Sequence, residues 1–406
     1  MKKIPVGITI GLMAITAAAS FVVTSNYTLD KFNKKISNVN EKQEFYSKLS
    51  EIDTYIRTHY VDEIDETTLI EGMVDGYISG IGDRFASYMT AEEYAEKQAA
   101  RQGIIEGLGF DYEREPGGYI RIKSVEIGGA AEDAGLLAGD IITAVNNTDV
   151  IAFEGGYDEA VSLFKCTEGT RVKLYVKRVT PEDGTNFIDY DVISRVSEHI
   201  TVTGRLINKT GCIRISDMTE KTEAQLKSRL EDLVSLGAEN LIIDLRDLDF
   251  DDPALLESSV DHIIGTGVVN AVFKNDTYEE VTVCTEAEEI KMPMCVLING
   301  GTGNMGEFFA LCLRDYGGAQ TVGTATMGNG RLQSPYVCSD GSVVMLSTAI
   351  LSTVNSGDIN GTGINPDVTV NLPDGTDISV MTTDDALVHD TQLLKALDIL
   401  SGDPND

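Results

Sequence analysis

The sequence predicts a multidomain protein: an N-terminal transmembrane helix and a helical segment, then a mainly β domain with two helices, then an α/β core. Three observations support this prediction. Residues 4–23 contain no charge, residues 103–192 contain short strands between glycine turns, and strands and helices alternate from Ile200 to about Pro373. With 406 residues, the chain is long enough for two or three domains that each have a core.

The composition is that of a globular protein with a strongly acidic surface. Hydrophobic residues make up 42% of the chain and charged residues 24%. Lys and Arg number 32 against 65 Asp and Glu, so the formal net charge is −33. Nucleic acids and anionic membrane surfaces are themselves negatively charged, and we therefore expect no nucleic-acid partner.

The uncharged run Ile4–Val23 is twenty residues long, enough to cross a hydrocarbon core of ~30 Å as a helix. A cleaved signal peptide is the alternative, because Ala17-Ala18-Ala19-Ser20 offers small residues for cleavage. The run exceeds the usual apolar core of such peptides, so we expect residues 1–26 to be a signal anchor. The protein would then be a single-pass protein of the cell membrane, with most of the chain extracytoplasmic.

Residues 27–45 are polar and predict a stalk, and residues 46–102 predict a helical segment. Helical spacing of apolar residues is visible in Phe45, Leu49, Ile52 and Ile56, and again in Leu69, Met73, Tyr77 and Ile78.

Cysteines and histidines show no metal-binding pattern. The cysteines at 166, 212, 284, 295, 312 and 338 have no C-x-x-C spacing, and most lie in apolar runs. We expect buried free thiols without a disulfide framework or zinc site, and neither a metal nor a cofactor.

Three motifs in residues 103–192 resemble a PDZ domain. Gly107-Leu108-Gly109-Phe110 matches the loop that receives a peptide carboxylate in such domains, and Ala130–Leu136 and Ala138–Asn146 follow in the family's order. A helix is expected from Tyr157 to Lys165, followed by an alternating strand after Gly169.

The resemblance implies that the domain binds peptide or protein C-termini. An extended ligand would add a strand beside Phe110, and its last side chain would lie near the carboxylate loop and one helix face. The implied binding residues are Leu108, Gly109, Phe110, Val161 and Phe164. The alternative is that Leu108, Phe110 and Val161 only fill the core of the domain.

Residues 193–406 predict an α/β core that ends in a helix. The expected elements are strands Cys212–Ile215, Leu241–Leu245 and Met294–Ile298, and helices Thr222–Leu236 and Pro253–Ile264.

Motifs of this core resemble the carboxyl-terminal processing peptidases, also called tail-specific serine proteases. They comprise Asn299–Glu307, Asp315-Tyr316-Gly317, Val322-Gly323, Gly328–Gln333, Gly361–Val370 and Asp390–Leu397. The resemblance covers most of residues 46–400.

Two catalytic positions implied by the resemblance are occupied by asparagine. Alignment on Glu307 puts the family's serine nucleophile at Asn304 and its lysine base at Asn329, with the family's spacing of 25 residues. Gln333, which would orient the lysine, is retained. An asparagine amide is a poor nucleophile and has no pKa in the working range, so it can neither attack a peptide nor accept its proton.

A third departure follows the strand Leu241–Leu245. The family continues into glycines, one of which helps to hold the oxyanion, whereas here the chain runs from Asp247 to Pro253 with four carboxylates. We expect those carboxylates to repel an oxyanion.

The sequence therefore predicts a membrane-anchored pseudoprotease that binds peptide or protein C-termini and does not hydrolyse them. An active serine-type endopeptidase with a non-standard nucleophile, or a structural envelope protein, are the alternatives. Thr302, Cys295 and Cys312 are the nearby nucleophile candidates. The sequence leaves a homodimer open.

Overall fold

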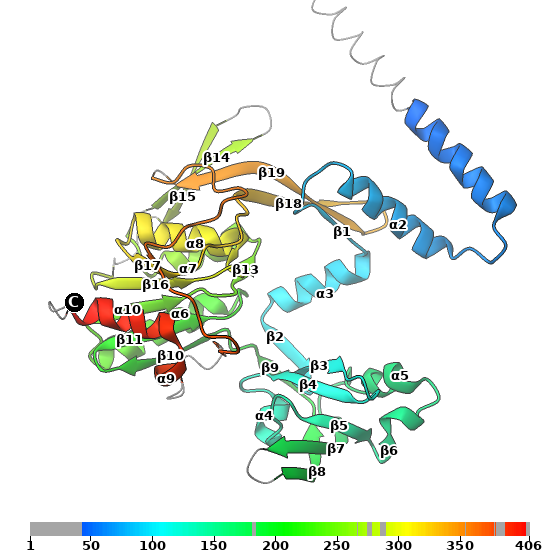
Figure 1. Ribbon diagram of the computed structural model, residues 1–406, viewed down its shortest axis with the longest axis horizontal. Helices are drawn as coiled ribbons and strands as arrows, with labels where there is room; N and C mark the ends of the chain where they lie inside the picture. The colour runs from blue at the N-terminus through cyan, green and yellow to red at the C-terminus, as the bar shows by residue number, and fades with distance from the viewer. Residues whose placement is uncertain are drawn as a thin grey trace, which may run out of the picture. The chain divides into compact units, whose positions relative to one another are not determined.

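Figure 1 shows the computed structural model of the chain, which describes residues 43–180, 184–265, 267–273, 278–284, 290–353, 355–376, 378 and 386–402. The chain divides into two compact units, Met1–Gly76 and Tyr77–Asp406. The expected anchor, Ile4–Val23, lies outside the described residues. Within those residues, no helix combines the length and apolar character that crossing a bilayer requires.

The expected helical segment is helical over residues 43–59, α2 (Glu66–Ser79) and α3 (Ala91–Arg101). It also contains a short strand, β1 (Ser87–Met89), which the sequence does not predict. A capping box starts α3, because Thr90 Oγ1 accepts from the Glu93 amide at 3.2 Å while the Glu93 carboxylate accepts from the Thr90 amide at 2.8 Å.

A mainly β domain follows α3. Its elements are β2 (Ile104–Gly107), β3 (Phe110–Arg114), β4 (Ile120–Val125), α4 (Ala130–Ala134), β5 (Ile141–Val145), β6 (Thr148–Asp149), η1 (Val150–Ala152), α5 (Gly156–Ser162), β7 (Arg171–Thr180), β8 (Gly184–Ile193) and β9 (Arg195–Glu198). The sheet order is β3-β4-β5-β7-β8 with β6 beside β5, and β2 pairs with β9. Ile122, Ile142 and Leu174 are fully buried in its core.

The α/β core contains β10 (Val202–Ile207), β11 (Thr210–Ile215), α6 (Thr222–Ser235), β12 (Asn240–Asp244), β13 (Asp249–Phe250), α7 (Pro253–Val260), β16 (Met294–Ile298), α8 (Asn304–Asp315), β17 (Gln320–Gly323), β20 (Val368–Thr369), α9 (Ala386–His389) and α10 (Thr391–Ser401). Its sheet order is β10-β11-β12-β16-β17-β20, parallel from β11 to β20. The helix expected over Pro253–Ile264 ends earlier, at Val260.

Helices cover both faces of this core sheet (Figure 1). Ile243 packs into the cluster formed with α6, α7 and α8, whereas its neighbour Ile242 packs with Leu393 and Ala396 of α10. Successive residues of a strand point to opposite faces, so an uninterrupted apolar run fits a sheet that is buried on both sides.

A second sheet has the order β1-β19-β14-β15, with β18 beside β19. It contains β14 (Gly267–Phe273), β15 (Tyr278–Cys284), β18 (Arg331–Val337) and β19 (Val343–Thr353). The antiparallel pairing of β18 with β19 fixes the position of Gln333, which lies opposite Ser347.

A buried ionic network connects the end of β12 to the start of α10. The guanidinium of Arg246 is fully buried and donates to Asp244 at 2.7 and 2.8 Å and to Asp390 at 2.7 Å. Asp390 also caps α10 by accepting from the amide of Leu393 at 2.9 Å. Burial opposes the charge of Asp244, but the ion pairs with Arg246 and Arg214 outweigh it and hold the pKa of Asp244 below its ordinary value.

Arg246→Met should lower the free energy of unfolding by about 3–5 kcal/mol, because it removes the cation paired with the buried Asp390 and leaves the buried Asp244 with Arg214 alone. Urea unfolding measures this loss. As a matched control, Lys209→Met removes the exposed partner of Glu239 and should cost about 1 kcal/mol or less. A loss no larger than the control's would contradict the role assigned to the network.

The pH dependence of that loss follows from the direction in which folding changes the pKa of Asp244. Because the folded state lowers the pKa of Asp244, its stabilisation is present above the ordinary carboxyl pKa of about 4 and disappears as the pH falls through the folded value. The difference between the parent and Arg246→Met should therefore shrink below about pH 4.

Candidate functional site

Asn304 lies at a sharp turn between β16 and α8. It is the first residue of α8 and has a φ of 47°, in the left-handed region that asparagine tolerates better than most residues. A strand-to-helix turn with a strained first residue is the backbone arrangement that exposes a nucleophile in other hydrolases. The backbone turn that would expose a nucleophile is therefore present at Asn304, although the side chain there is an amide.

The side chain of Asn304 is held from both ends. Its Nδ2 donates to Asp249 Oδ1, and its Oδ1 accepts from Nδ2 of Asn329. The structure thus brings together the two asparagines that the sequence places at the nucleophile and base positions. Neither amide can accept a proton from an attacking group in the working pH range.

A buried carboxylate holds the loop that carries Asn329. Glu307 accepts from Thr326 Oγ1, from the amide of Gly328 at 2.8 Å and from the amide of Asn329 at 2.6 Å. Burial raises the pKa of Glu307 despite these three donors. From outside, the guanidinium of Arg84 donates to the Gly328 carbonyl at 2.6 Å.

Gln333 is nearly buried and lies in β18, a strand of the second sheet. Its Nε2 donates to Ser347 Oγ at 2.7 Å, and the amide of Ser347 in turn donates to Asp83 at 3.0 Å. Among the described residues, Gln333 Oε1 and Asn329 Oδ1 are buried oxygens without a hydrogen-bond partner. The retained glutamine is therefore fixed in place by the sheet.

The segment at the implied oxyanion position lies directly against α8. Asp249 and Phe250 form parallel bridges with Gly303 and Asn304. Gly306 has no room for a side chain, because a Cβ there would overlap the carbonyl oxygen of Leu248. The segment without glycines is therefore packed as an extra short strand, β13.

The charges of this segment differ from the expectation that all four carboxylates would repel an oxyanion. Lys97 Nζ pairs with Asp251 at 2.5 Å, and Arg101 Nε pairs with Asp252 at 2.6 Å. Asp252 also caps α7, accepting from the Ala254 amide at 2.9 Å. Because two of the carboxylates are neutralised by cations of α3, the expected repulsion is reduced to Asp247 and Asp249.

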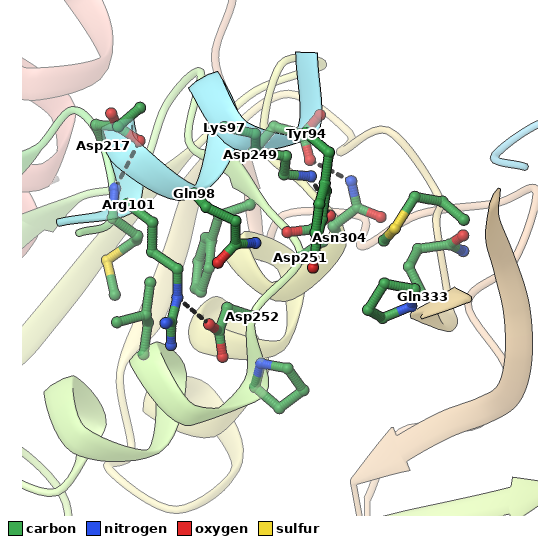
Figure 2. Close-up of a pocket in the computed structure, with 17 residues that line it drawn as sticks. Tyr94, Lys97, Gln98, Arg101, Asp217, Asp249, Asp251, Asp252, Asn304 and Gln333 are labelled. Carbon is green, nitrogen blue, oxygen red and sulfur yellow. Dashed lines mark hydrogen bonds and ion pairs between the residues drawn. The ribbon is translucent and has the colours of Figure 1, made fainter. Parts of the chain in front are cut away.

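A cleft of about 520 Å³ opens between α3, β13 and the second sheet (Figure 2). Its lining residues are Tyr94, Lys97, Gln98, Ala100, Arg101, Asp217, Met218, Asp249, Phe250, Asp251, Asp252, Pro253, Leu255, Asn304, Gln333, Pro335 and Met345. These lining residues include no Ser, Thr, Cys or His. Among the described residues, no group of three or more His, Cys, Asp or Glu side chains is placed to hold a metal ion.

The other nucleophile candidates are not among the lining residues of this cleft. Thr302 is fully buried and donates to the Leu245 carbonyl at 2.8 Å. Cys312 is fully buried further along α8, and burial raises the pKa of the Cys295 thiol to about 12. Cys338 is exposed, contrary to the expectation of buried thiols, but it does not line the cleft.

The implied peptide groove of the mainly β domain is rich in aromatic rings. The ring of Phe164 lies 5.1 Å from that of Phe110 and 5.4 Å from that of Tyr112, both edge to face. Leu108 is buried in the domain core, as the alternative interpretation expects, whereas Phe110 and Val161 are partly exposed beside it; Phe164 is buried as well. Gly109 has a φ of 75°, and a Cβ there would meet Gly129 Cα at 3.1 Å.

Sequence reasoning missed the residues that reach the site from α3 and from the segment before β1. Asp83, Arg84, Lys97 and Arg101 contact partners more than 100 positions away in the chain. No local spacing signals such pairs. The acidic run that begins at Asp247 is a signal that could have pointed to cations nearby.

Comparison with known sequences assigns three regions of the chain. The model of peptidase family S41 matches residues 209–370, that of a PDZ domain matches residues 121–178, and that of the activating protease CtpB N-terminal domain matches residues 8–93.

Similar proteins cover most of the chain. The carboxy-terminal processing protease CtpA of Bacillus subtilis (strain 168) is 27% identical over 363 residues, which are 89% of this chain and 75% of that protein. A probable CtpA-like serine protease of Staphylococcus aureus (strain COL) is 27% identical over 373 residues, 91% of this chain and 72% of that protein.

A crystal structure of a candidate S41 protease from Bacteroides fragilis NCTC 9343 shares the fold, with a TM-score of 0.56 and 16% identity, and covers 84% of this chain and 92% of that one. These comparisons confirm the expected multidomain arrangement of a PDZ domain and a protease-like core. The chain therefore combines a region that matches peptidase family S41 with regions that match a PDZ domain and a CtpB-type N-terminal domain, and its homologues are named carboxy-terminal processing protease.

Proposed function

We propose that this chain is a catalytically silent member of the S41 family that binds peptide or protein C-termini. The hydrogen-bonded chain Asp249–Asn304–Asn329 carries this proposal. In this chain of contacts, the positions of the nucleophile and the base are occupied by two amides that are hydrogen-bonded to each other. A Ser-Lys hydrolase needs a hydroxyl that attacks and a neutral amine that takes its proton, and neither group is present at these positions.

The composition of the cleft argues against a substitute nucleophile. Lys97 is the one lysine among the lining residues of the cleft, and its Nζ is paired with Asp251 at 2.5 Å. The buried thiols Cys295 and Cys312 lie outside the lining. An active endopeptidase with a non-standard nucleophile would therefore require a large rearrangement.

The purified chain should not hydrolyse unstructured peptides above the uncatalysed background. Loss of one member of a catalytic unit can cost on the order of 10⁶ in rate, and here two members are absent. The assay is peptide cleavage followed by mass spectrometry, with an active S41 protease as the positive control. Turnover that disappears on changing one residue other than Asn304 or Asn329 would disprove the proposal.

The variant Asn304→Ser with Asn329→Lys tests the contribution of the neighbouring segment. We expect far less than normal turnover, because Phe250 and Asp251 stand where the family has glycine at the oxyanion position. Near-normal turnover of this double variant would show that β13 does not impair oxyanion binding.

We propose that the PDZ domain binds weakly to peptides with a free apolar carboxyl terminus. Backbone N–H groups of the Gly107–Phe110 loop would hold the carboxylate, and Phe110, Tyr112 and Val161 would contact the side chains. Calorimetric titration with a free-acid peptide and its amide should give weaker binding for the amide. Equal affinities would refute the role of the loop.

A matched pair of glycine variants provides the control for this titration. Gly109 and Gly184 both have a φ of 75°, but only Gly109 lies in the loop, and a Cβ at Gly184 meets nothing within 4 Å. Gly109→Val should weaken binding of the free acid, whereas Gly184→Val carries similar backbone strain and should leave it unchanged.

We also propose that Ile4–Val23 is retained as a membrane anchor, with the remainder of the chain extracytoplasmic. An uncharged run of twenty residues satisfies its own backbone as a helix in lipid. Cell fractionation should find the chain in the membrane with its original amino terminus, or only Met1 removed. A soluble mature form that begins near Ser20 would establish a cleaved signal peptide instead.

A further inference from the structure

One wall of the cleft is the helix α3. Tyr94, Lys97, Gln98, Ala100 and Arg101 of this helix line the cleft together with Asn304. Figure 2 shows Tyr94 and Lys97 next to Asp249 and Asp251, on the side of the cleft where Asn304 lies. No residue of α3 is buried, so apolar packing contributes little to its position.

Ionic contacts hold the body of α3 in this position. Lys97 and Arg101 are four residues apart and therefore project from the same helix face. Lys97 pairs with Asp251 at 2.5 Å, and Arg101 pairs with Asp252 at 2.6 Å and with Glu220 at 2.9 Å. The side chains of these pairs are between 24% and 49% exposed, so salt can screen them.

The two ends of α3 are fixed by other means. Before the helix, β1 pairs with β19 of the second sheet. After the helix, the Arg101 carbonyl accepts from the Glu220 amide at 2.9 Å, and the Gly103 carbonyl accepts from the His199 amide at 2.9 Å. Both ends of the helix are thus fixed by backbone hydrogen bonds, and its body is held beside the cleft by ion pairs.

We propose that α3 is an ionic lid over the cleft, closed by the pairs Lys97–Asp251 and Arg101–Asp252 and opened when these pairs are screened or displaced. Asp251 and Asp252 belong to the segment that replaces the family's glycines, so the residues that alter the oxyanion position also form the lid contacts. With no buried side chain, α3 belongs to the parts of a fold that open at low free energy. This lid does not depend on whether the cleft hydrolyses peptides.

The test measures access to the cleft in the full chain. The thiol introduced by Asn304→Cys is reacted either with a polyethylene-glycol maleimide or with N-methylmaleimide, and labelling of that residue is followed by peptide mass spectrometry. The ratio of the bulky to the small reagent's rate reports access, because changes in thiol reactivity affect both reagents alike. In the parent, raising NaCl from about 0.05 to 1 M should increase the ratio, since the Debye length falls from more than 10 Å to about 3 Å.

Variants of the two pairs should reproduce the effect of salt. Asp251→Asn and Asp252→Ser, which keeps an oxygen to cap α7, should each increase the ratio about two- to fivefold, and salt should add little once both are present. Lys97→Glu combined with Asp251→Lys should return the ratio to that of the parent, because it restores the pair with the charges exchanged.

Glu96→Gln is the matched control on the same helix. Glu96 pairs with Lys165 at 3.5 Å and does not line the cleft, so its replacement should leave the ratio unchanged. The proposal is overturned if the ratio does not respond to salt, if the exchanged pair fails to restore it, or if Glu96→Gln raises it as much as Asp251→Asn does.

Discussion

The buried guanidinium of Arg246 is the constraint on which the site depends. It lies between Asp244 at the end of β12 and Asp390 at the start of α10, with both carboxylates at 2.7 Å. Two anions and one cation without contact with water must keep their geometry, because each would be strongly destabilised alone. The chain therefore leaves β12 in one fixed direction, which sends the segment after Arg246 to the amino-terminal end of α8.

That direction explains the crowding around Asn304. The segment after Arg246 runs close enough to α8 for Asp249 and Phe250 to bridge to Gly303 and Asn304. Asn304 then has an acceptor on one side, Asp249, and a donor on the other, Asn329. A serine hydroxyl can also donate one hydrogen bond and accept another, but both would have to meet at a single oxygen on a shorter side chain, whereas the asparagine amide offers a donor and an acceptor on separate atoms.

The sequence was sufficient for the core elements and for the identity of the two asparagines. An apolar run such as that in β16 is buried on both faces, and its periodicity is local, so it can be read directly. Helix ends were less well predicted, since α7 stops at Val260 where the apolar pattern continues to Ile264. Turns and tertiary contacts decide such ends, and these do not appear in the local pattern.

The partners of the acidic segment could not be predicted, because their sequence separation is large. Lys97 meets Asp251 across 154 positions, and Arg84 meets Gly328 across 244. Nothing in the helical spacing of α3 distinguishes a cation that faces water from one that faces a distant carboxylate. The burial of Leu108 and Phe164 could not be predicted either, since a residue that lines a groove and a residue that fills a core are both apolar.

At the positions that the proposed function assigns to a serine-type site, the residues present have compensating contacts, which distinguishes this site from one that has merely lost residues. A glycine replaced by a carboxylate near a cleft would normally leave a charge with a desolvation cost. Here Asp251 is paired with Lys97, Asp252 is paired with Arg101 and accepts from the Ala254 amide, and Asp249 accepts from the side-chain amide of Asn304. The remaining desolvation cost falls on two buried amide oxygens without a hydrogen-bond partner, Asn329 Oδ1 and Gln333 Oε1. A set of substitutions that supplies partners for one another is expected when the altered site is itself kept as a stable structure, with α3 as one of its walls.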